Sequence, residues 1–214
     1  MSFFEQKEIK KQDMHMLTTS RPQMGKQLLE TSELFRAVID ACDQTLASLA
    51  DGPSWSILDE LMQPKETSRL PKASFSQPIC SALQIGLVEL WKSWGITPHG
   101  VVGHSSGEIG AAYASGLLSL REAIIIAYYR GLYLGENATR EHTPGLKGAM
   151  CAVGLDEAGC LLLCKKYEGR IALAAVNSPS SCTLSGDADA IKEVVETCAA
   201  QGTFCRALRV DMGT

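Results

Sequence analysis

Residues 101–108 read Val-Val-Gly-His-Ser-Ser-Gly-Glu, and this stretch decides the fold that the sequence predicts. Two β-branched residues lead into a turn of glycine and serine, and a helix-like run from Glu108 to Ala114 follows. Strand, sharp turn and helix in this order are typical of a nucleophile elbow, where a serine stands on a strained turn above a sheet. The pattern predicts Ser105 as the nucleophile and residues 100–103 as its strand. The alternative interpretation is an ordinary strand-to-helix turn.

The neighbours of Ser105 have predicted roles in this turn. Gly103 and Gly107 have no side chains, so we expect the strand and the helix to cross closely. The backbone N–H of Ser106 comes first at the helix N-terminus, where the oxyanion of an acyl-transfer reaction would develop. His104 is adjacent to the nucleophile in a tight turn, so we expect it to point elsewhere and not to act as the general base.

The composition is that of a globular protein. Of the 214 residues, 45% are hydrophobic and 21% are charged, which suffices for a core and argues against disorder. The net charge of −4 and the lack of a basic run make nucleic acid a poor partner. No apolar run has the length of a membrane span, and no signal peptide is visible at the N-terminus. We therefore expect a cytoplasmic protein without a membrane partner.

Eight cysteines are scattered along the chain, and none forms a C-x-x-C pair. Most lie in apolar surroundings, which is typical of reduced, buried thiols in a cytosolic protein. Cys160 and Cys164 share a predicted helix face, but no further metal ligands accompany them. The sequence therefore predicts no metal site and no bound cofactor.

The first part of the chain, up to residue 147, reads as helices around one or two strands. Helices are expected over residues 27–49, 55–61, 78–94 and 119–134, and polar loops over 64–76 and 135–147. Gly95 is expected to end the third of these helices. Ser119 and Glu122 form a capping box that begins the fourth.

The second part, residues 148–210, has a different period. Strands are expected over residues 148–154, 171–177, 182–185 and 204–210, and helices over 156–167 and 188–201. Asp156 and Asp187 are predicted N-caps, and Gly202 is predicted to close the last helix. The order β-α-β-β-α-β is the ferredoxin-like motif, which predicts a four-stranded antiparallel sheet with two helices on one face.

Several motifs, in a constant order, carry a resemblance to a known family. They lie at residues 76–78 (Ser-Gln-Pro), 90–98, 103–109, 129–131 (Tyr-Arg-Gly), 174–179 and 184–187. In this order they resemble the acyltransferase domain of polyketide and fatty acid synthases, the malonyl-CoA:acyl-carrier-protein transacylase family. The serine at the second position of the elbow, Ser106, makes the motif resemble that of the reducing type of fungal polyketide synthase. The resemblance covers residues 22–212 almost continuously.

This resemblance implies an α/β fold with a large and a small part. Residues 22–147 would form an incomplete α/β-hydrolase-like core of the acyltransferase, and residues 148–212 an inserted ferredoxin-like small subdomain. Residues 1–21 are an atypical N-terminal segment, because they lack the family's opening pattern.

The resemblance also implies the chemistry and the site. The family's serine, here Ser105, attacks a malonyl-type CoA thioester, forms an acyl-enzyme and passes the acyl group to the phosphopantetheine thiol of an acyl carrier protein. Arg130, 25 residues later, matches the arginine that binds the free malonyl carboxylate. Gln77 is either a polar group at the substrate or a residue that begins a helix. Asn177 is expected to cap a turn and to line the cleft between the subdomains. The CoA thioester and phosphopantetheine are substrates, and other polyketide synthase domains are possible partners.

The chain departs from the family at both ends. Residues 16–20, Met-Leu-Thr-Thr-Ser, stand where the family has a Gly-Gln-Gly-x-Gln loop that completes the oxyanion hole. The catalytic histidine would fall beyond Thr214, and His15, His99, His104 and His142 do not match it. The expectation is therefore an acyltransferase domain truncated at both ends, without its general base. Two alternatives stay open: a non-catalytic remnant or interaction module of a polyketide synthase, and a generic serine hydrolase, which Arg130 and the unmatched histidine disfavour.

Overall fold

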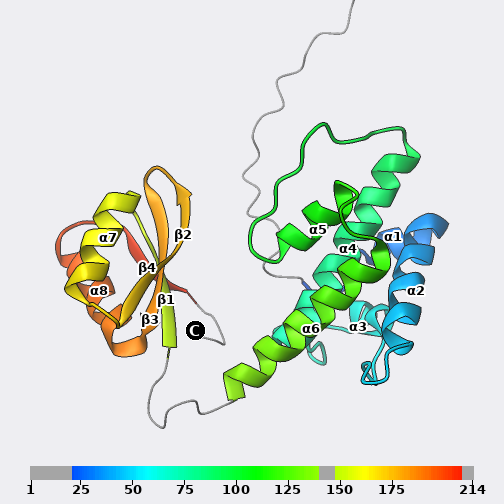
Figure 1. Ribbon diagram of the computed structural model, residues 1–214. Helices are drawn as coiled ribbons and strands as arrows, with labels where there is room; N and C mark the ends of the chain where they lie inside the picture. The colour runs from blue at the N-terminus through cyan, green and yellow to red at the C-terminus, as the bar shows by residue number, and fades with distance from the viewer. Residues whose placement is uncertain (1–20, 140–147, 209–214) are drawn as a thin grey trace, which may run out of the picture. The chain divides into compact units, whose positions relative to one another are not determined.

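The computed structural model describes residues 21–139 and 148–208. The chain divides into two units, Met1–Tyr133 and Leu134–Thr214, and each is described by itself (Figure 1). The expected boundary after residue 147, and all of the expected N-terminal segment except Arg21, fall outside the described residues and stay predictions.

The described residues of the first unit form helices. Their bounds are α1 Lys26–Thr31, α2 Glu33–Ala47, α3 Ile57–Met62, α4 Ala73–Ser93, α5 Gly107–Ala114 and α6 Leu120–Thr139, which continues past Tyr133 (Figure 1). Helix α4 lies in the middle, in contact with α2, α3 and α5. Its buried side chains join those of α2 and α6 in one hydrophobic core. No described helix is long and apolar enough to cross a membrane.

The single helix expected over residues 27–49 is in fact two helices, α1 and α2. Ser32 separates them with an extended backbone, φ −124° and ψ 108°. Its hydroxyl accepts a hydrogen bond from the N–H of Phe35 at 3.2 Å, as an N-cap does. A serine next to helical residues favours such a cap. The helical spacing of apolar residues therefore continues although the helix itself is interrupted at Ser32.

Helix α4 begins at Ala73, so the loop expected over residues 64–76 is shorter than predicted. Pro78 lies inside the helix, where it has no N–H to donate to the carbonyl of Ser74. The predicted end of the helix is confirmed. Trp94 is the C-cap, and Gly95 follows with φ 76°, a conformation that glycine adopts without steric cost.

A close helix contact in this core joins Gly86 of α4 to Phe35 of α2. Phe35 is 0% exposed, and a Cβ on Gly86 would lie 2.5 Å from its Cε2 atom. Only a hydrogen at position 86 lets the aromatic ring lie on the helix backbone.

We expect Gly86→Ala to destabilise the chain by about 1–2 kcal/mol. Alanine gains about 1 kcal/mol in helix propensity, but overpacking a full core costs about 1–3 kcal/mol, and the ring has no free space to move into. Urea unfolding followed by circular dichroism measures the difference. The control is Phe35→Leu, which should cost less in the Gly86→Ala chain than in the unmodified chain; additive costs would contradict the contact.

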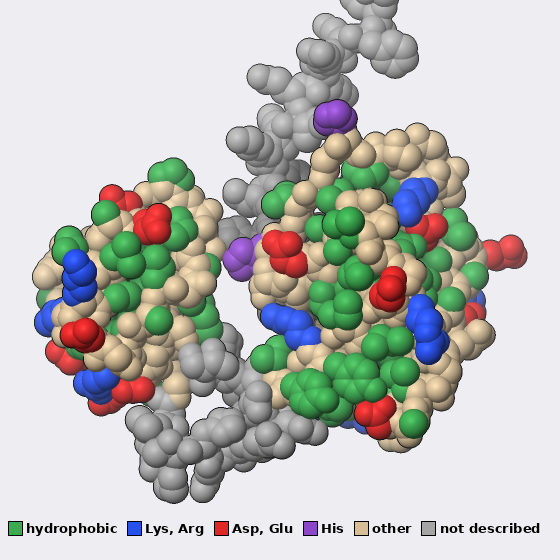
Figure 2. Space-filling model, in the orientation of Figure 1, with side chains coloured by type: hydrophobic (Ala, Val, Ile, Leu, Met, Phe, Trp, Pro, Cys, Tyr) green, Lys and Arg blue, Asp and Glu red, His purple; other side chains and the backbone are tan. Residues whose placement is uncertain are grey.

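The strand expected over residues 100–103 is absent. This segment has no strand partner within the described part of the chain, and Val101 and Val102 are 40% and 76% exposed. Figure 2 shows hydrophobic side chains at the visible surface of both units. A strand is defined by its hydrogen-bonded neighbour, so the β-branched pattern alone did not suffice to form one.

Helix α6 begins as predicted. The Ser119 N–H donates to the Glu122 carboxylate at 2.8 Å, and the Glu122 N–H donates to the Ser119 hydroxyl at 3.2 Å, which is the reciprocal capping box. The helix ends at Thr139 instead of residue 134, so the loop expected from residue 135 starts later. Residues 140–147 lie outside the described ranges.

The second unit has the predicted order of strands and helices. The elements are β1 Gly148–Val153, α7 Glu157–Lys166, β2 Ile171–Ser178, β3 Ser181–Asp187, α8 Ala188–Ala200 and β4 Cys205–Leu208. The strands form an antiparallel sheet in the order β2-β3-β1-β4, in which Gly148 of β1 pairs with Asp187 of β3. Helices α7 and α8 lie together on one face of this sheet (Figure 1). Residues 209–210 of the last expected strand are outside the described residues.

The two predicted aspartate caps differ. The carboxylate of Asp156 accepts the N–H of Gly159 at 2.8 Å and caps α7 as expected. Asp187 precedes α8, but its side chain makes no cap hydrogen bond. It accepts instead from the Arg170 guanidinium at 3.1 Å, because a charged partner competes with the helix N–H groups for the same oxygens. Gly202 closes α8 with φ 70°, as predicted.

Candidate functional site

Ser105 has the backbone of an elbow nucleophile. Its φ is 53°, in the left-handed region that non-glycine residues rarely enter, which costs about 1–3 kcal/mol. It lies on the turn between residues 100–104 and helix α5, and its side chain is exposed. The strain predicted from the sequence is therefore present, although the strand before the turn is not.

Ser106 places a backbone donor beside the nucleophile. The two N–H groups that follow it are engaged, since Gly107 donates to the His104 carbonyl at 2.9 Å and Glu108 to the Ser105 carbonyl at 3.1 Å. Within the described residues, the N–H of Ser106 has no hydrogen-bond partner. Ser106 is 5% exposed. A donor without a partner at a helix N-terminus is suited to a developing oxyanion.

The two elbow glycines differ. A Cβ on Gly103 would lie 2.4 Å from the Glu108 nitrogen and 2.5 Å from the Gly107 carbonyl carbon. Gly107 itself has open space around its Cα, because a Cβ there would meet no atom within 4 Å. Gly103 alone allows the close crossing of the turn and α5, and the same role expected for Gly107 was wrong.

Arg130 contacts both Ser105 and Gln77. Arg130 of α6 donates from Nη2 to the Ser105 hydroxyl at 3.4 Å. Its Nη1 donates to the amide oxygen of Gln77, which lies in α4. Gly131 brings the helices together, since a Cβ there would be 2.7 Å from the Ala73 carbonyl oxygen. The structure thus groups three of the predicted site residues around one guanidinium.

Asn177 belongs to the second unit and lies in strand β2. Its side-chain nitrogen donates to the Thr183 hydroxyl of β3 at 3.0 Å, so it links two strands. The turn cap expected of Asn177 stays a prediction. Its expected place in a cleft between subdomains stays a prediction.

The thiols are poor candidates for a second nucleophile. All eight cysteines are free, and six are buried. Burial raises the pKa of Cys42 to about 12, and burial also raises the pKa of Cys160. Such thiols stay protonated near neutral pH, and the thiolate is the reactive form. In residues 21–139 and 148–208, no group of histidine, cysteine and carboxylate side chains could hold a metal ion.

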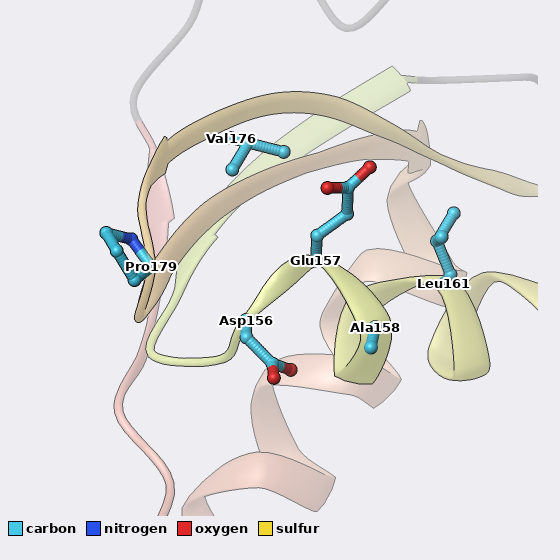
Figure 3. A pocket seen from close by; sticks show the side chains of 6 residues that line it. All are labelled: Asp156, Glu157, Ala158, Leu161, Val176 and Pro179. Carbon is cyan, nitrogen blue, oxygen red and sulfur yellow. The ribbon is translucent and has the colours of Figure 1, made fainter.

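The second unit also has a shallow hollow, of about 510 Å³ (Figure 3). It lies between α7 and the β2–β3 hairpin, with Glu157 and Leu161 projecting from α7 toward the strands. Its carboxylates belong to Asp156, which already caps α7, and to Glu157. No predicted site residue lines this hollow.

A protein-family model matches nearly the whole chain. The model for the acyl transferase domain matches residues 21–214. The chain belongs to the acyltransferase domain family. The family predicted from the motifs is therefore confirmed.

The most similar relatives of this acyltransferase domain include fungal polyketide synthases. It is 52% identical, over 189 residues, to the hybrid PKS-NRPS synthetase pyvA of Aspergillus violaceofuscus, covering 87% of this chain and 5% of that protein. It is 49% identical, over 191 residues, to the highly reducing polyketide synthase ACTTS3 of Alternaria alternata, covering 88% and 8%. The chain therefore spans under a tenth of these relatives.

Solved structures confirm the α/β fold. The acyltransferase domain from module 8 of the salinomycin polyketide synthase is 31% identical with a TM-score of 0.78, over 91% of this chain and 44% of that one. The malonyl CoA-acyl carrier protein transacylase of Coxiella burnetii, at 23% identity and TM-score 0.77, shares the fold over 92% of this chain and 60% of that one.

One contact was not predicted from the sequence. Gln77 was placed either at the substrate or at a helix start, but it is the fifth residue of α4 and holds Arg130. The motifs place Gln77 and Arg130 53 residues apart, and no periodic pattern relates them. Only the packing of α6 on α4 brings them together.

Proposed function

We propose that this acyltransferase domain moves a malonyl-type acyl group from CoA to the phosphopantetheine thiol of an acyl carrier protein within a polyketide synthase. The observation that carries the proposal is the 3.4 Å contact between the Arg130 guanidinium and the Ser105 hydroxyl. A permanent cation at the nucleophile suits an acyl group with its own carboxylate. A generic serine hydrolase needs no such cation at its serine.

The proposed reaction has two transfers through Ser105. Its Oγ attacks the thioester carbonyl and gives up its proton, the C–S bond then breaks, and a serine ester forms while the CoA sulfur leaves and takes up a proton. The phosphopantetheine sulfur then attacks this ester, and Ser105 leaves as its hydroxyl. The unpartnered N–H of Ser106 supports stabilisation of each tetrahedral oxyanion.

Arg130 would select the acyl group by charge and by reach. A guanidinium and a carboxylate form a charge-assisted pair, which an acetyl group cannot make. Because Nη2 lies 3.4 Å from Oγ, the acyl carboxylate has to lie near the attacked carbonyl. In a malonyl group one carbon separates the two, which fits that short span.

We expect Arg130→Ala to erase a preference for malonyl-CoA over acetyl-CoA of roughly 100-fold, the upper end for hydrogen bonds between charged groups. Calorimetric titration of both thioesters measures it. Arg121→Ala is the matched control, because Arg121 lies in the same helix and contacts Ser48 instead of the elbow. Equal binding of the two thioesters by the unmodified chain would refute the proposal.

The remaining assignments follow from this proposal. The second unit would serve as the ferredoxin-like small subdomain, supported by its β-α-β-β-α-β order and the sheet order β2-β3-β1-β4. Asn177 would line its side of the cleft. Eight free thiols favour a reducing compartment, so we place the activity in the cytoplasm.

A further inference from the structure

We infer that Gln77 is a positioning residue that holds the Arg130 guanidinium over Ser105, and not a ligand of the acyl group. This inference rests on the proposed function for its effect on substrate choice. It replaces the substrate-binding role that the sequence suggested for Gln77.

The guanidinium is held at two points. Nη1 donates to Gln77 and Nη2 to Ser105, so a neutral acceptor and the nucleophile lie on its two Nη groups. The second contact, at 3.4 Å, is long for a hydrogen bond. Without Gln77, the long and flexible arginine side chain would keep only the weaker of the two hydrogen bonds that it makes within the described residues.

The backbone of Gln77 is held in place by the packing of two helices. A Cβ on Gly131, the residue after Arg130, would lie 3.0 Å from the Gln77 Cβ, so α6 lies directly on this turn of α4. Pro78 follows and is buried in the same helix. The backbone positions of both partners are therefore set by helix packing.

The chemistry of the amide fits a positioning role. A guanidinium only donates hydrogen bonds, so the amide of Gln77 must present its oxygen to Arg130. A carbonyl oxygen repels a carboxylate. Because the amide is neutral, it orients Arg130 and leaves the positive charge available to the acyl group. A glutamate at residue 77 would neutralise that charge.

The test compares Gln77→Leu and Gln77→Glu with Gln84→Leu. Gln84 lies in the same helix but contacts α5 at Gly110, and its amide oxygen has no hydrogen-bond partner. Titration of the whole chain should show malonyl-CoA affinity reduced about tenfold by Gln77→Leu and about 100-fold by Gln77→Glu. Acetyl-CoA affinity should not change, and Gln84→Leu should change neither. A merely structural role would weaken both thioesters equally.

A second readout needs no acyl group. Rotation of the Arg130 guanidinium, followed by NMR of nitrogen-labelled arginine and assigned with Arg130→Ala, should be slow in the unmodified chain and faster in Gln77→Leu. If the unmodified chain prefers malonyl-CoA and Gln77→Leu leaves that preference unchanged, the positioning role is wrong and the proposed function stands. If the chain shows no preference, the proposed function is wrong, and unrestricted rotation would overturn the positioning role as well.

Discussion

The purified chain should acylate Ser105 with malonyl-CoA about 10⁴-fold more slowly than a serine that has a general base in contact. Within the described residues, the only hydrogen-bond partner of the Ser105 hydroxyl is Arg130. A guanidinium has no lone pair to accept a proton. Attack by Oγ must then release its proton to water, although the elbow and the Ser106 N–H are in place.

Mass spectrometry of the chain after mixing with malonyl-CoA measures this rate, with Ser105→Ala as the control that removes the adduct. Added imidazole supplies a base from solution and should accelerate the adduct on Ser105 without producing one in Ser105→Ala. An adduct complete within seconds, without imidazole, would contradict the expectation and assign the base to a residue outside the described ranges.

The elbow was predictable because its requirements are local. A serine with φ 53°, two residues after a glycine that no side chain could replace, is encoded in a few consecutive residues. The capping box at Ser119 and the cap at Asp156 are local for the same reason. In each of these, one side chain and a backbone group within three residues decide the geometry.

The failed expectations depend on partners that are distant in sequence. The strand at residues 100–103 needs a neighbouring strand. The Asp187 carboxylate binds Arg170, 17 residues before it, instead of capping α8. The link between Gln77 and Arg130 exists only because two helices pack at Gly131. A pattern of residue types describes what one segment prefers, but not which distant group competes for it.

Gly103→Ala should cost about 3 kcal/mol of stability, the upper end for an added methyl group in a packed site. The new Cβ would meet three backbone atoms of Gly107 and Glu108 within 2.5 Å. Backbone cannot move aside by changing a rotamer, as a side chain can, so the turn would have to open. That movement would also relax Ser105 and carry its hydroxyl away from Arg130.

Gly107→Ala is the matched control for this prediction, four residues along the same motif. It begins α5 in open space, so alanine there should leave stability unchanged or raise it by up to about 1 kcal/mol. Thermal and urea unfolding of both variants measures the contrast. Labelling of Ser105 by a fluorophosphonate should fall in Gly103→Ala and persist in Gly107→Ala. Equal stability of the two variants would show that the turn does not need the close crossing at Gly103.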